Sequence, residues 1–415
     1  MWRINVINDP LPNFVIQSKK QLSISIKDVN SENLLLIKNL LRKYALRIVE
    51  INIETGHKNP DSCIRKFFKE LQKLAPLWKN LRELTLGKFV WQNCDVKIMF
   101  GGCLSVLTKL SMTTGDVLSC DYKYFQFTNL KSLTLSFCHV DSRILVPIAA
   151  NLKHLQLSYM GKFDLSALEE TSTTFPSLKS LKLKNCAINI ANFLAKCYDS
   201  LEELEITGKN VCCDGTLPKL TRLKKLTLLL CPLNLAHLLA MCCHSLQHLK
   251  IVEYKWLRID DLKGCCFLDL KSLQIMNGSG KNIVKFLTTV NETLESLELG
   301  ALNSQIDFSM FKKIKMLKLQ TIKINFEVKP VKNIEIFFKN CPRIHSVTIE
   351  YGIFALMFDV MCLEDRSRSQ QTLIRPAGHF SRNLLSLLSA TQSTLRHLKI
   401  VNRCCVENLE FLGKN

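Results

Sequence analysis

The chain has 415 residues, of which 47% are hydrophobic and 22% charged, a balance that excludes a disordered polypeptide. Lysine and arginine number 56 against 36 acidic residues, and the formal net charge of +20 favours acidic partners. No apolar run approaches the roughly 18 residues of a membrane span, and the first residues lack the basic and apolar regions of a secretory signal. We therefore expect a protein of the cytoplasm or nucleus, without a membrane partner, whose 18 cysteines are reduced thiols.

The first residues are predicted to cover one end of a repeat array. Strand-like sequences at 3–7 and 22–27, followed by an apolar helical pattern at 31–44, indicate two strands and a helix. The end of such an array has to be covered, because an open repeat exposes its apolar core and a strand edge. We assign residues 1–45 to N-terminal capping strands and a helix, and residues 46–415 to the repeat domain.

One apolar pattern recurs through the repeat domain: an apolar residue, two variable residues, a second apolar residue, one variable residue and a third apolar residue. Its eight clear copies begin 22 to 26 residues apart, within the range of about 20–29 residues that is typical of leucine-rich repeats. They start at Leu130, Leu152, Leu178, Leu201, Leu223, Leu246, Leu270 and Leu294. Weaker copies start at Ile48, Leu81, Leu107, Ile314 (with Leu317 and Leu319), Ile344 and Leu395.

The spacing within the pattern predicts which way the side chains point. The second and third apolar residues are two apart, so they lie on one side of a strand and face the core, while their neighbours face away. Small Ala and Cys residues at helical spacing in 186–206 and 231–251 indicate helical connections. We expect an α/β fold, a leucine-rich-repeat solenoid (horseshoe) of about 14 repeats, with a concave parallel β-sheet and helices or irregular connections on the convex side.

One interval departs from the period. Ile344 and Leu395 are 51 residues apart, and the segment at about 352–385 between them is either a degenerate repeat or an inserted loop. Inserted loops on solenoids often carry binding residues, but surface loops also tolerate insertions that have no function.

Cysteines recur at two positions of the repeat. They lie eight residues after the first apolar residue, at Cys138, Cys186 and Cys231, or three or four residues before it, at Cys103, Cys197, Cys242, Cys266 and Cys341. Together with the phrase FFKNCPRIHSVTI from Phe337, these positions make residues 46–415 resemble the cysteine-containing subclass of leucine-rich repeats, best known from F-box proteins. The resemblance implies a substrate receptor of a cullin-RING ubiquitin ligase.

The F-box itself is not found in this sequence. That module is helical, whereas residues 13–26 contain the strand-like QLSISI and no helical apolar pattern. The resemblance therefore implies a Skp-type adaptor and a cullin as partners only if an F-box lies upstream.

The variable positions of the strands supply the candidate binding residues. Those predicted to face the concave side carry mixed charge, which suits a protein partner better than a uniform phosphate track. The partner-binding candidates are His154, Lys182, Lys184, Glu203, Glu205, Lys225, His248, Lys250, Lys318 and Lys399. The first variable position predicts a basic rim, or simply solvated strand starts, at Arg82, Lys131, Lys153, Lys179, Lys224, Lys271, Lys315 and Arg396.

We expect no catalytic, cofactor-binding or metal-binding residues. The sequence has no CxxC or HExxH motif, and its adjacent cysteine pairs are poor bidentate ligands on a regular backbone. His154, His248 and His397 share one repeat position but belong to distant repeats, so they do not form one cluster. No nucleophile, base and orienting group occur together, so we expect that the chain is not an enzyme.

The sequence thus predicts a non-enzymatic protein-interaction scaffold. The resemblance to the F-box type of repeat implies the substrate-recognition part of a ubiquitin-ligase receptor, which would bind a protein partner (a ubiquitination substrate) on its concave face. The alternative is a basic leucine-rich-repeat protein that binds nucleic acid or another polyanion. We favour the protein partner, because the repeat strands show no regular aromatic stacking platform for nucleic acid.

Overall fold

The computed structural model describes part of the chain. It comprises residues 2–6, 21–27, 34–54, 69–71, 73–89, 105–114, 127–137, 142–161, 163, 165–231, 235–252, 265–276, 280–300, 308–326, 334–351, 395–402 and 408–412. The chain divides into two compact units, Met1–Pro218 and Lys219–Asn415, and each is described by itself. The segment at about 352–385, predicted as a degenerate repeat or a loop, lies outside the described residues.

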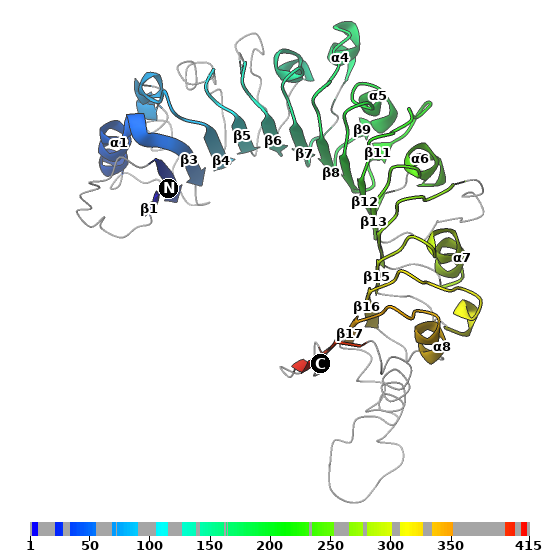
Figure 1. Ribbon diagram of the computed structural model, residues 1–415. Helices are drawn as coiled ribbons and strands as arrows, with labels where there is room; N and C mark the ends of the chain where they lie inside the picture. Colours follow the sequence, from blue (N-terminus) through cyan, green and yellow to red (C-terminus); the bar gives the residue numbers. More distant parts are fainter. Residues whose placement is uncertain are drawn as a thin grey trace, which may run out of the picture. The chain divides into compact units, whose positions relative to one another are not determined.

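The strands of the first unit pair in parallel, each with the next along the chain (Figure 1). They are β1 (Trp2–Val6), β2 (Leu22–Lys27), β3 (Ile48–Glu54), β4 (Glu83–Phe89), β5 (Lys109–Thr114), β6 (Ser132–Ser136), β7 (His154–Ser158), β8 (Ser180–Lys184) and β10 (Glu203–Thr207). The register places equivalent repeat positions side by side, as in the row Leu133, Leu155, Leu181 and Leu204. Consecutive copies of the apolar pattern therefore form consecutive strands of one sheet.

The connecting segments of the first unit carry short helices, which lie on one side of the strands (Figure 1). They are α1 (Leu34–Lys43), η1 (Ala45–Arg47), η2 (Ala75–Leu77), η4 (Ser142–Ile148), α4 (Ser166–Glu170) and α5 (Ile190–Leu194). Asn189 precedes the helix α5 as its N-cap, and its side chain accepts a hydrogen bond from the Ala191 amide. Two further short strands, β9 (Ile188–Asn189) and β11 (Val211–Cys212), pair with each other in the connections.

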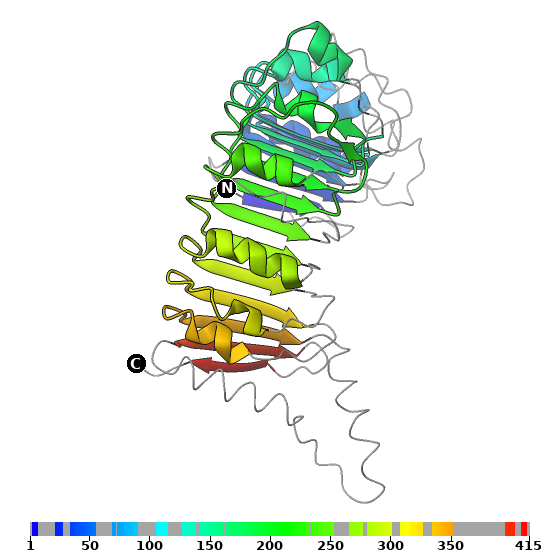
Figure 2. The same cartoon turned by 90° about the vertical axis from the view of Figure 1, so that its right-hand side faces the viewer.

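The second unit repeats the arrangement. Its parallel strands are β12 (Lys225–Leu229), β13 (His248–Val252), β14 (Ser272–Met276), β15 (Ser296–Gly300), β16 (Thr321–Phe326), β17 (Ser346–Tyr351) and β18 (His397–Asn402), and β19 (Asn408–Leu412) pairs antiparallel with β18. Its helices are α6 (Leu235–Cys242), α7 (Gly280–Val290), η6 (Phe308–Phe311) and α8 (Ile334–Lys339). Figure 2 shows the yellow, orange and red strands of this unit side by side, with helices in front of them.

The apolar positions of each repeat form the core. Leu130, Leu133 and Leu135 are at most 1% exposed, and burial alternates along the strand between them. Aromatic side chains fill the space under the connections, as in the stacked pair Phe175 and Phe193, whose ring centroids lie 5.3 Å apart. These repeats, their parallel sheet and their helical connections define a leucine-rich-repeat solenoid, which confirms the predicted α/β fold class.

Side chains just before the first apolar residue tie each repeat to the preceding one. Asn129 and Asn151 donate hydrogen bonds from Nδ2 to the carbonyls of Ser105 and Thr128, at 2.6 and 2.9 Å. Ser200, at the same position of a later repeat, donates from Oγ toward carbonyls of the preceding turn. These bonds satisfy turn carbonyls that no strand or helix pairs, which is why polar residues occupy this position.

The main chain at the start of each strand forms a second ladder. The Lys153 carbonyl accepts hydrogen bonds from the amides of Lys179 and Ser180, and the Lys179 carbonyl accepts from those of Glu202 and Glu203. The same two-donor arrangement recurs along both units, from Arg82 in the first to His345 in the second. This ladder fixes the row of residues that begins the strands.

The predicted register of one repeat is wrong. The sequence pattern begins a copy at Ile314 with Leu317 and Leu319, but Leu317 is 54% exposed. The three core-facing apolar residues of this repeat are Leu319, Ile322 and Ile324, at most 2% exposed. Leu319 lies 25 residues after Leu294 and 25 before Ile344, so the period is regular here. Ile314 is buried in the connection between η6 and β16 instead, together with Phe311 and Met316.

The cysteines at the repeated positions are small buried side chains. Cys186 and Cys231, eight residues after the first apolar residue, are at most 5% exposed, and Cys186 Sγ lies 3.3 Å from the Leu157 carbonyl of an earlier repeat. Cys197, Cys242 and Cys341 are also buried free thiols. In one further repeat the buried residue is Cys265, whereas the predicted Cys266 is exposed. Cys103 and Cys138 lie outside the described residues.

Candidate partner-binding surface

The side of the sheet that faces away from the core presents three rows of side chains, which we call the strand face. They are the residues directly before, between and directly after the second and third apolar residues of each repeat. In the first unit they include Glu50, Asn52, Glu83, Thr85, Lys109, Ser111, Ser132, Thr134, Ser136, His154, Gln156, Ser158, Ser180, Lys182, Lys184, Glu203, Glu205 and Thr207. In the second they include Lys225, Thr227, His248, Lys250, Ser272, Gln274, Ser296, Glu298, Thr321, Lys323, Asn325, Ser346, Thr348, Glu350, His397 and Lys399.

The structure brings three of the predicted residues together on β8 and β10. Glu205 accepts ion pairs from Lys182 and Lys184, with Nζ–Oε distances of 3.3 and 3.2 Å. Burial raises the pKa of the Glu205 carboxyl, but the hydrogen bonds and charges of Lys184 and Lys182 outweigh it, so the pKa lies below its ordinary value of 4.5. One carboxylate between two ammonium groups leaves this cluster with a net positive charge.

Two further predicted residues flank this cluster. Glu203 lies two residues before Glu205, on the same side of β10. Its Oε2 accepts a hydrogen bond from Ser180 Oγ at 3.1 Å. His154 begins β7 opposite Ser180 and is exposed. All five predicted residues of the first unit therefore lie on the strand face of β7, β8 and β10.

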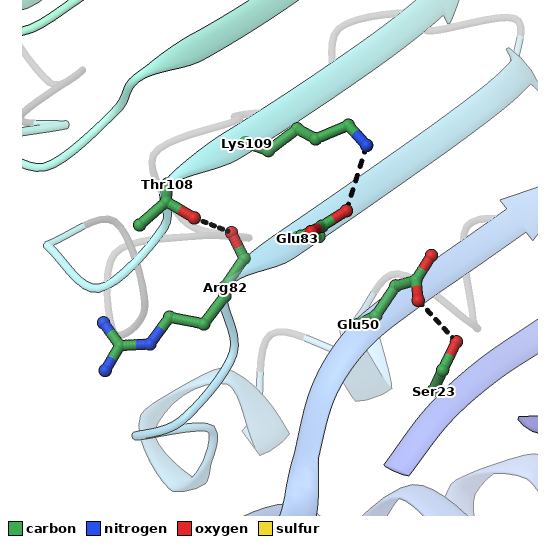
Figure 3. Close-up of polar contacts among 6 residues, drawn as sticks. All are labelled: Ser23, Glu50, Arg82, Glu83, Thr108 and Lys109. Carbon is green, nitrogen blue, oxygen red and sulfur yellow. Dashed lines mark hydrogen bonds and ion pairs between the residues drawn. The ribbon is translucent and has the colours of Figure 1, made fainter. Parts of the chain in front are cut away.

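Earlier repeats of this unit carry polar contacts that the sequence pattern did not single out. Figure 3 shows Ser23 donating to Glu50 at 2.6 Å and Lys109 paired with Glu83 at 3.0 Å, each between adjacent strands. These residues share the repeat position of His154 and Glu203. Their position in the repeat would have been sufficient to find them.

In the second unit the charge pattern is centred on a residue that sequence reasoning missed. Lys323, in the middle of β16, pairs with Glu298 at 3.2 Å and with Glu350 at 2.9 Å. The hydrogen bond to Glu350, with the charge of Glu298, raises the pKa of Lys323 above its ordinary value of 10.5. Lys318 was predicted in this role, but it precedes the strand, because the register of that repeat is shifted by five residues.

The other predicted residues of the second unit occupy the expected rows. Lys225 and His248 are partners across β12 and β13, and both are exposed. Lys250 lies between Thr227 and Gln274, and exposed Lys399 lies beside Thr348. Their placement on the strand face is as predicted, and their contact with a partner stays a prediction.

Part of the predicted basic rim lies in the ladder of strand-start residues. The ladder of strand-start residues contains Lys131, Lys153 and Lys179 on consecutive strands of the first unit, all exposed. Lys179 pairs with Glu202 at 3.1 Å, which ends the run of positive charge. Arg82 is separated from the run by Thr108 (Figure 3).

The rim of the second unit is mixed. Lys224, Lys271 and Arg396 lie in the ladder, but Gln247 separates the first two, and Glu295, Gln320 and His345 lie between Lys271 and Arg396. Lys315 does not belong to the ladder. It lies in the turn before the strand, where its carbonyl accepts a hydrogen bond from Asn291. Its assignment to the rim is wrong for the same reason as that of Lys318.

An aromatic pair on the first unit was not predicted. Phe137 and Tyr159, the residues directly after β6 and β7, stack with ring centroids 4.4 Å apart and an interplanar angle of 4°. They are 48% and 50% exposed, and their φ angles are 57° and 53°. The apolar pattern does not include this position, because the position follows the last residue of the strand.

The described residues hold no group of three or more His, Cys, Asp or Glu side chains arranged to bind a metal ion. Within the same part of the chain, no helix has the length and apolar character needed to cross a membrane.

Comparisons with known proteins do not show the family of this chain. No protein-family model and no curated protein matches the sequence. One solved structure that matches is the "Crystal structure of TLR13-ssRNA13 complex", with 16% sequence identity and a TM-score of 0.49. The match covers 81% of this chain and 46% of that one, so this chain spans about half of that protein's length. Similarity at this level does not bear on what the chain binds.

Proposed function

We propose that this chain is a non-enzymatic scaffold that binds a protein partner through its strand face. The observation that carries the proposal is the cluster of Lys182, Glu205 and Lys184, in which opposite charges alternate between adjacent strands. A rigid parallel sheet holds these charges in fixed positions, so a partner with the complementary pattern is favoured and one with the same pattern is rejected.

A polyanion such as nucleic acid is the second candidate. The net charge of +20 and the neighbouring Lys131 and Lys153 support it. The three carboxylates of Glu202, Glu203 and Glu205 argue against it, because a phosphate backbone that continued from this run across β10 would meet negative charge. We therefore favour the protein partner.

The finer proposal is that the partner is a ubiquitination substrate and that the chain is the substrate-recognition part of an F-box-type receptor. Its support is the resemblance of the repeats, with cysteines such as Cys186, Cys197 and Cys242 buried at recurrent positions. The role requires a Skp-type adaptor and a cullin, recruited through an F-box upstream of this sequence. Purification of the protein from cytoplasmic and nuclear extracts tests it. A preparation that retains a partner but no adaptor or cullin contradicts the ligase role and leaves the scaffold.

The scaffold proposal is tested by neutralising the cluster. The double variant Lys182→Gln/Lys184→Gln removes two positive charges from the strand face, and we expect it to lose the proteins that the unchanged chain captures. The amounts are compared by quantitative mass spectrometry of the two captures.

The matched control is Lys313→Gln/Lys339→Gln, which removes the same charge from exposed lysines of connecting segments. It should capture the same proteins as the unchanged chain. Equal capture by all three chains contradicts the proposal. A uniform loss of capture with added salt in all three, together with retention on a polyanion column, favours the polyanion alternative.

A further inference from the structure

The residue that follows each strand adopts a left-handed backbone conformation at several consecutive repeats. In the first unit these residues are Phe137, Tyr159, Asn185 and Gly208, with φ angles of 57°, 53°, 51° and 107°. The backbone amides make equivalent bonds, since Phe137 donates to the Ser158 carbonyl, Tyr159 to that of Lys184 and Asn185 to that of Thr207. The same backbone turn is thus made by phenylalanine, tyrosine and asparagine, and a glycine takes the corresponding position after β10.

The fold does not require aromatic side chains at this turn. Glycine and asparagine adopt positive φ at low cost, whereas bulky side chains do so with strain. Asn185 and Gly208 therefore adopt their positive φ angles at low cost, whereas Phe137 and Tyr159 adopt theirs with strain. Strained residues persist where the surrounding structure holds them, and they concentrate at ligand-binding positions.

The two rings are presented to the outside rather than to the core. Each is about half exposed, at 48% and 50%, although a phenylalanine or tyrosine that served packing would be buried like Phe175. Their parallel stacking at 4.4 Å fills the space between them, so a planar group has no room between the rings. What remains available is the outer face and the edges of a rigid apolar platform.

Lys184 is the main-chain neighbour of this platform. The Tyr159 amide, directly after β7, donates to the Lys184 carbonyl at 2.6 Å, so Tyr159 and the end of β8 lie side by side. The Lys184 side chain is 37% exposed, and its partner Glu205 is shared with Lys182. The two lysines together exceed the one carboxylate, which makes a further carboxylate from a partner favourable at Lys184.

We propose that Phe137, Tyr159 and Lys184 form a binding site for an acidic protein segment that carries an aromatic or large aliphatic side chain. The apolar side chain packs on the exposed ring surface, and an adjacent Asp or Glu carboxylate pairs with the Lys184 ammonium group. This inference rests on the proposed function and names the chemistry of the partner. A protein segment is favoured over a nucleic acid, because Glu203 and Glu205 of β10 lie beside the lysines of β8, so a continuous phosphate chain would meet carboxylates as well as ammonium groups.

The test is a selection of random displayed peptides against the full chain, followed by affinity measurements with the selected peptides. We expect enrichment of peptides that combine an aromatic or leucine residue with Asp or Glu. The double variant Phe137→Asn/Tyr159→Asn should weaken their binding by about tenfold or more, as for aromatic residues at the centre of an interface. Asparagine is chosen because it already occupies the same backbone position at Asn185, so the variant keeps its fold and its melting temperature reports this.

The matched control is Leu230→Asn, which replaces an exposed apolar residue with φ of 56° at the same repeat position in the second unit. It should leave the affinities unchanged. Peptides without an acidic and apolar bias, or peptides that bind the Phe137→Asn/Tyr159→Asn variant as well as the unchanged chain, overturn the inference. So does a single-stranded RNA of mixed sequence whose binding depends on the two rings.

The two proposals fail in different ways. If the selected peptides bind the strand face but ignore the two rings, the inference falls and the scaffold remains. If no peptide is enriched and the Lys182→Gln/Lys184→Gln variant also captures the same proteins as the unchanged chain, both fall.

Discussion

The side chain of Asn185 occupies the space that a side chain on Gly208 would need. A Cβ built on Gly208 would clash with Asn185 Oδ1 and would lie 3.0 Å from Asn185 Cα. Gly208 also has φ of 107°, a conformation that residues with a Cβ rarely adopt. The turns after β8 and β10 therefore fit together only if the second of them is a glycine.

The substitution Gly208→Ala should destabilise the first unit by about 2–4 kcal/mol, since backbone strain and the clash add. The matched control is Gly215→Ala, where φ is 117° but no atom lies within 4 Å of the added Cβ. The Gly215→Ala substitution should lower the free energy of unfolding by only about 1–2 kcal/mol, from backbone strain alone. Urea denaturation of both variants gives the comparison, and equal midpoints would mean that Asn185 moves aside without cost.

The corrected register around β16 gives a second matched pair. Ile322→Ala removes a side chain that is 2% exposed and should cost about 2–5 kcal/mol. Leu317→Ala, five residues earlier, changes a side chain that is 54% exposed and should shift stability by no more than about 0.5 kcal/mol. The opposite order of the two urea midpoints would support the register that begins at Ile314.

The cluster around Glu205 predicts a pH dependence. Its folded pKa lies below 4.5, so its ion pairs stabilise the fold at neutral pH, and this contribution is lost as the pH falls below about 4.5 toward the folded pKa. Glu205→Gln should therefore lower stability at pH 7 and have a smaller effect at pH 3. The control Glu170→Gln, at an exposed residue that ends α4, should have little effect at either pH. A Glu205→Gln effect that is equal at both pH values contradicts the assignment.

Thiol reactivity should separate the buried cysteines from the exposed ones. Burial raises the pKa of Cys197 and of Cys341 to about 12, so at pH 8 roughly one thiol in ten thousand is ionised. Cys266 is exposed. A short pulse of iodoacetamide on the folded protein, followed by peptide mass spectrometry, should label Cys266 and spare the other two until urea is added. Equal labelling without urea would place Cys197 and Cys341 at the surface.

The strands could be predicted from sequence because they carry two periods at once: the two-residue alternation of a strand and the interval between repeats. Leu133 and Leu135 alternate with polar residues, and the same triplet returns every 22 to 26 residues, so each copy confirms the others. Burial of all three apolar positions follows from this pattern without any knowledge of the connections. The Lys182 and Lys184 positions follow as well, since they alternate with the buried leucines.

The pattern failed at Leu317 because two overlapping triplets fit the same sequence. The triplets at Ile314 and at Leu319 both place apolar residues at the required spacing, and apolar character alone does not choose between them. The regular interval of 25 residues on either side of Leu319 was the signal that could have decided, and it also moves the lysine on the strand face to Lys323.

The aromatic pair escaped prediction for a different reason. The position after the strand is defined by its backbone conformation, and apolar periodicity carries no information about φ. Asn185 and Gly208, which both favour positive φ, hold the equivalent position in later repeats and would have marked the turn. That Phe137 and Tyr159 share it becomes apparent only once the strands are aligned.

The main-chain ladder at the strand starts has a consequence for how such a protein changes in evolution. The Lys153 carbonyl accepts from the next repeat, while the Lys153 amide donates to the Lys131 carbonyl of the repeat before. Each repeat of this ladder therefore offers its successor the same acceptor that it uses in its predecessor, whatever side chains it carries. A duplicated repeat would find both of its connections already provided. The gene could lengthen in whole-repeat steps, each of which widens the sheet by about 4.8 Å and adds three new variable positions to the surface on which selection acts.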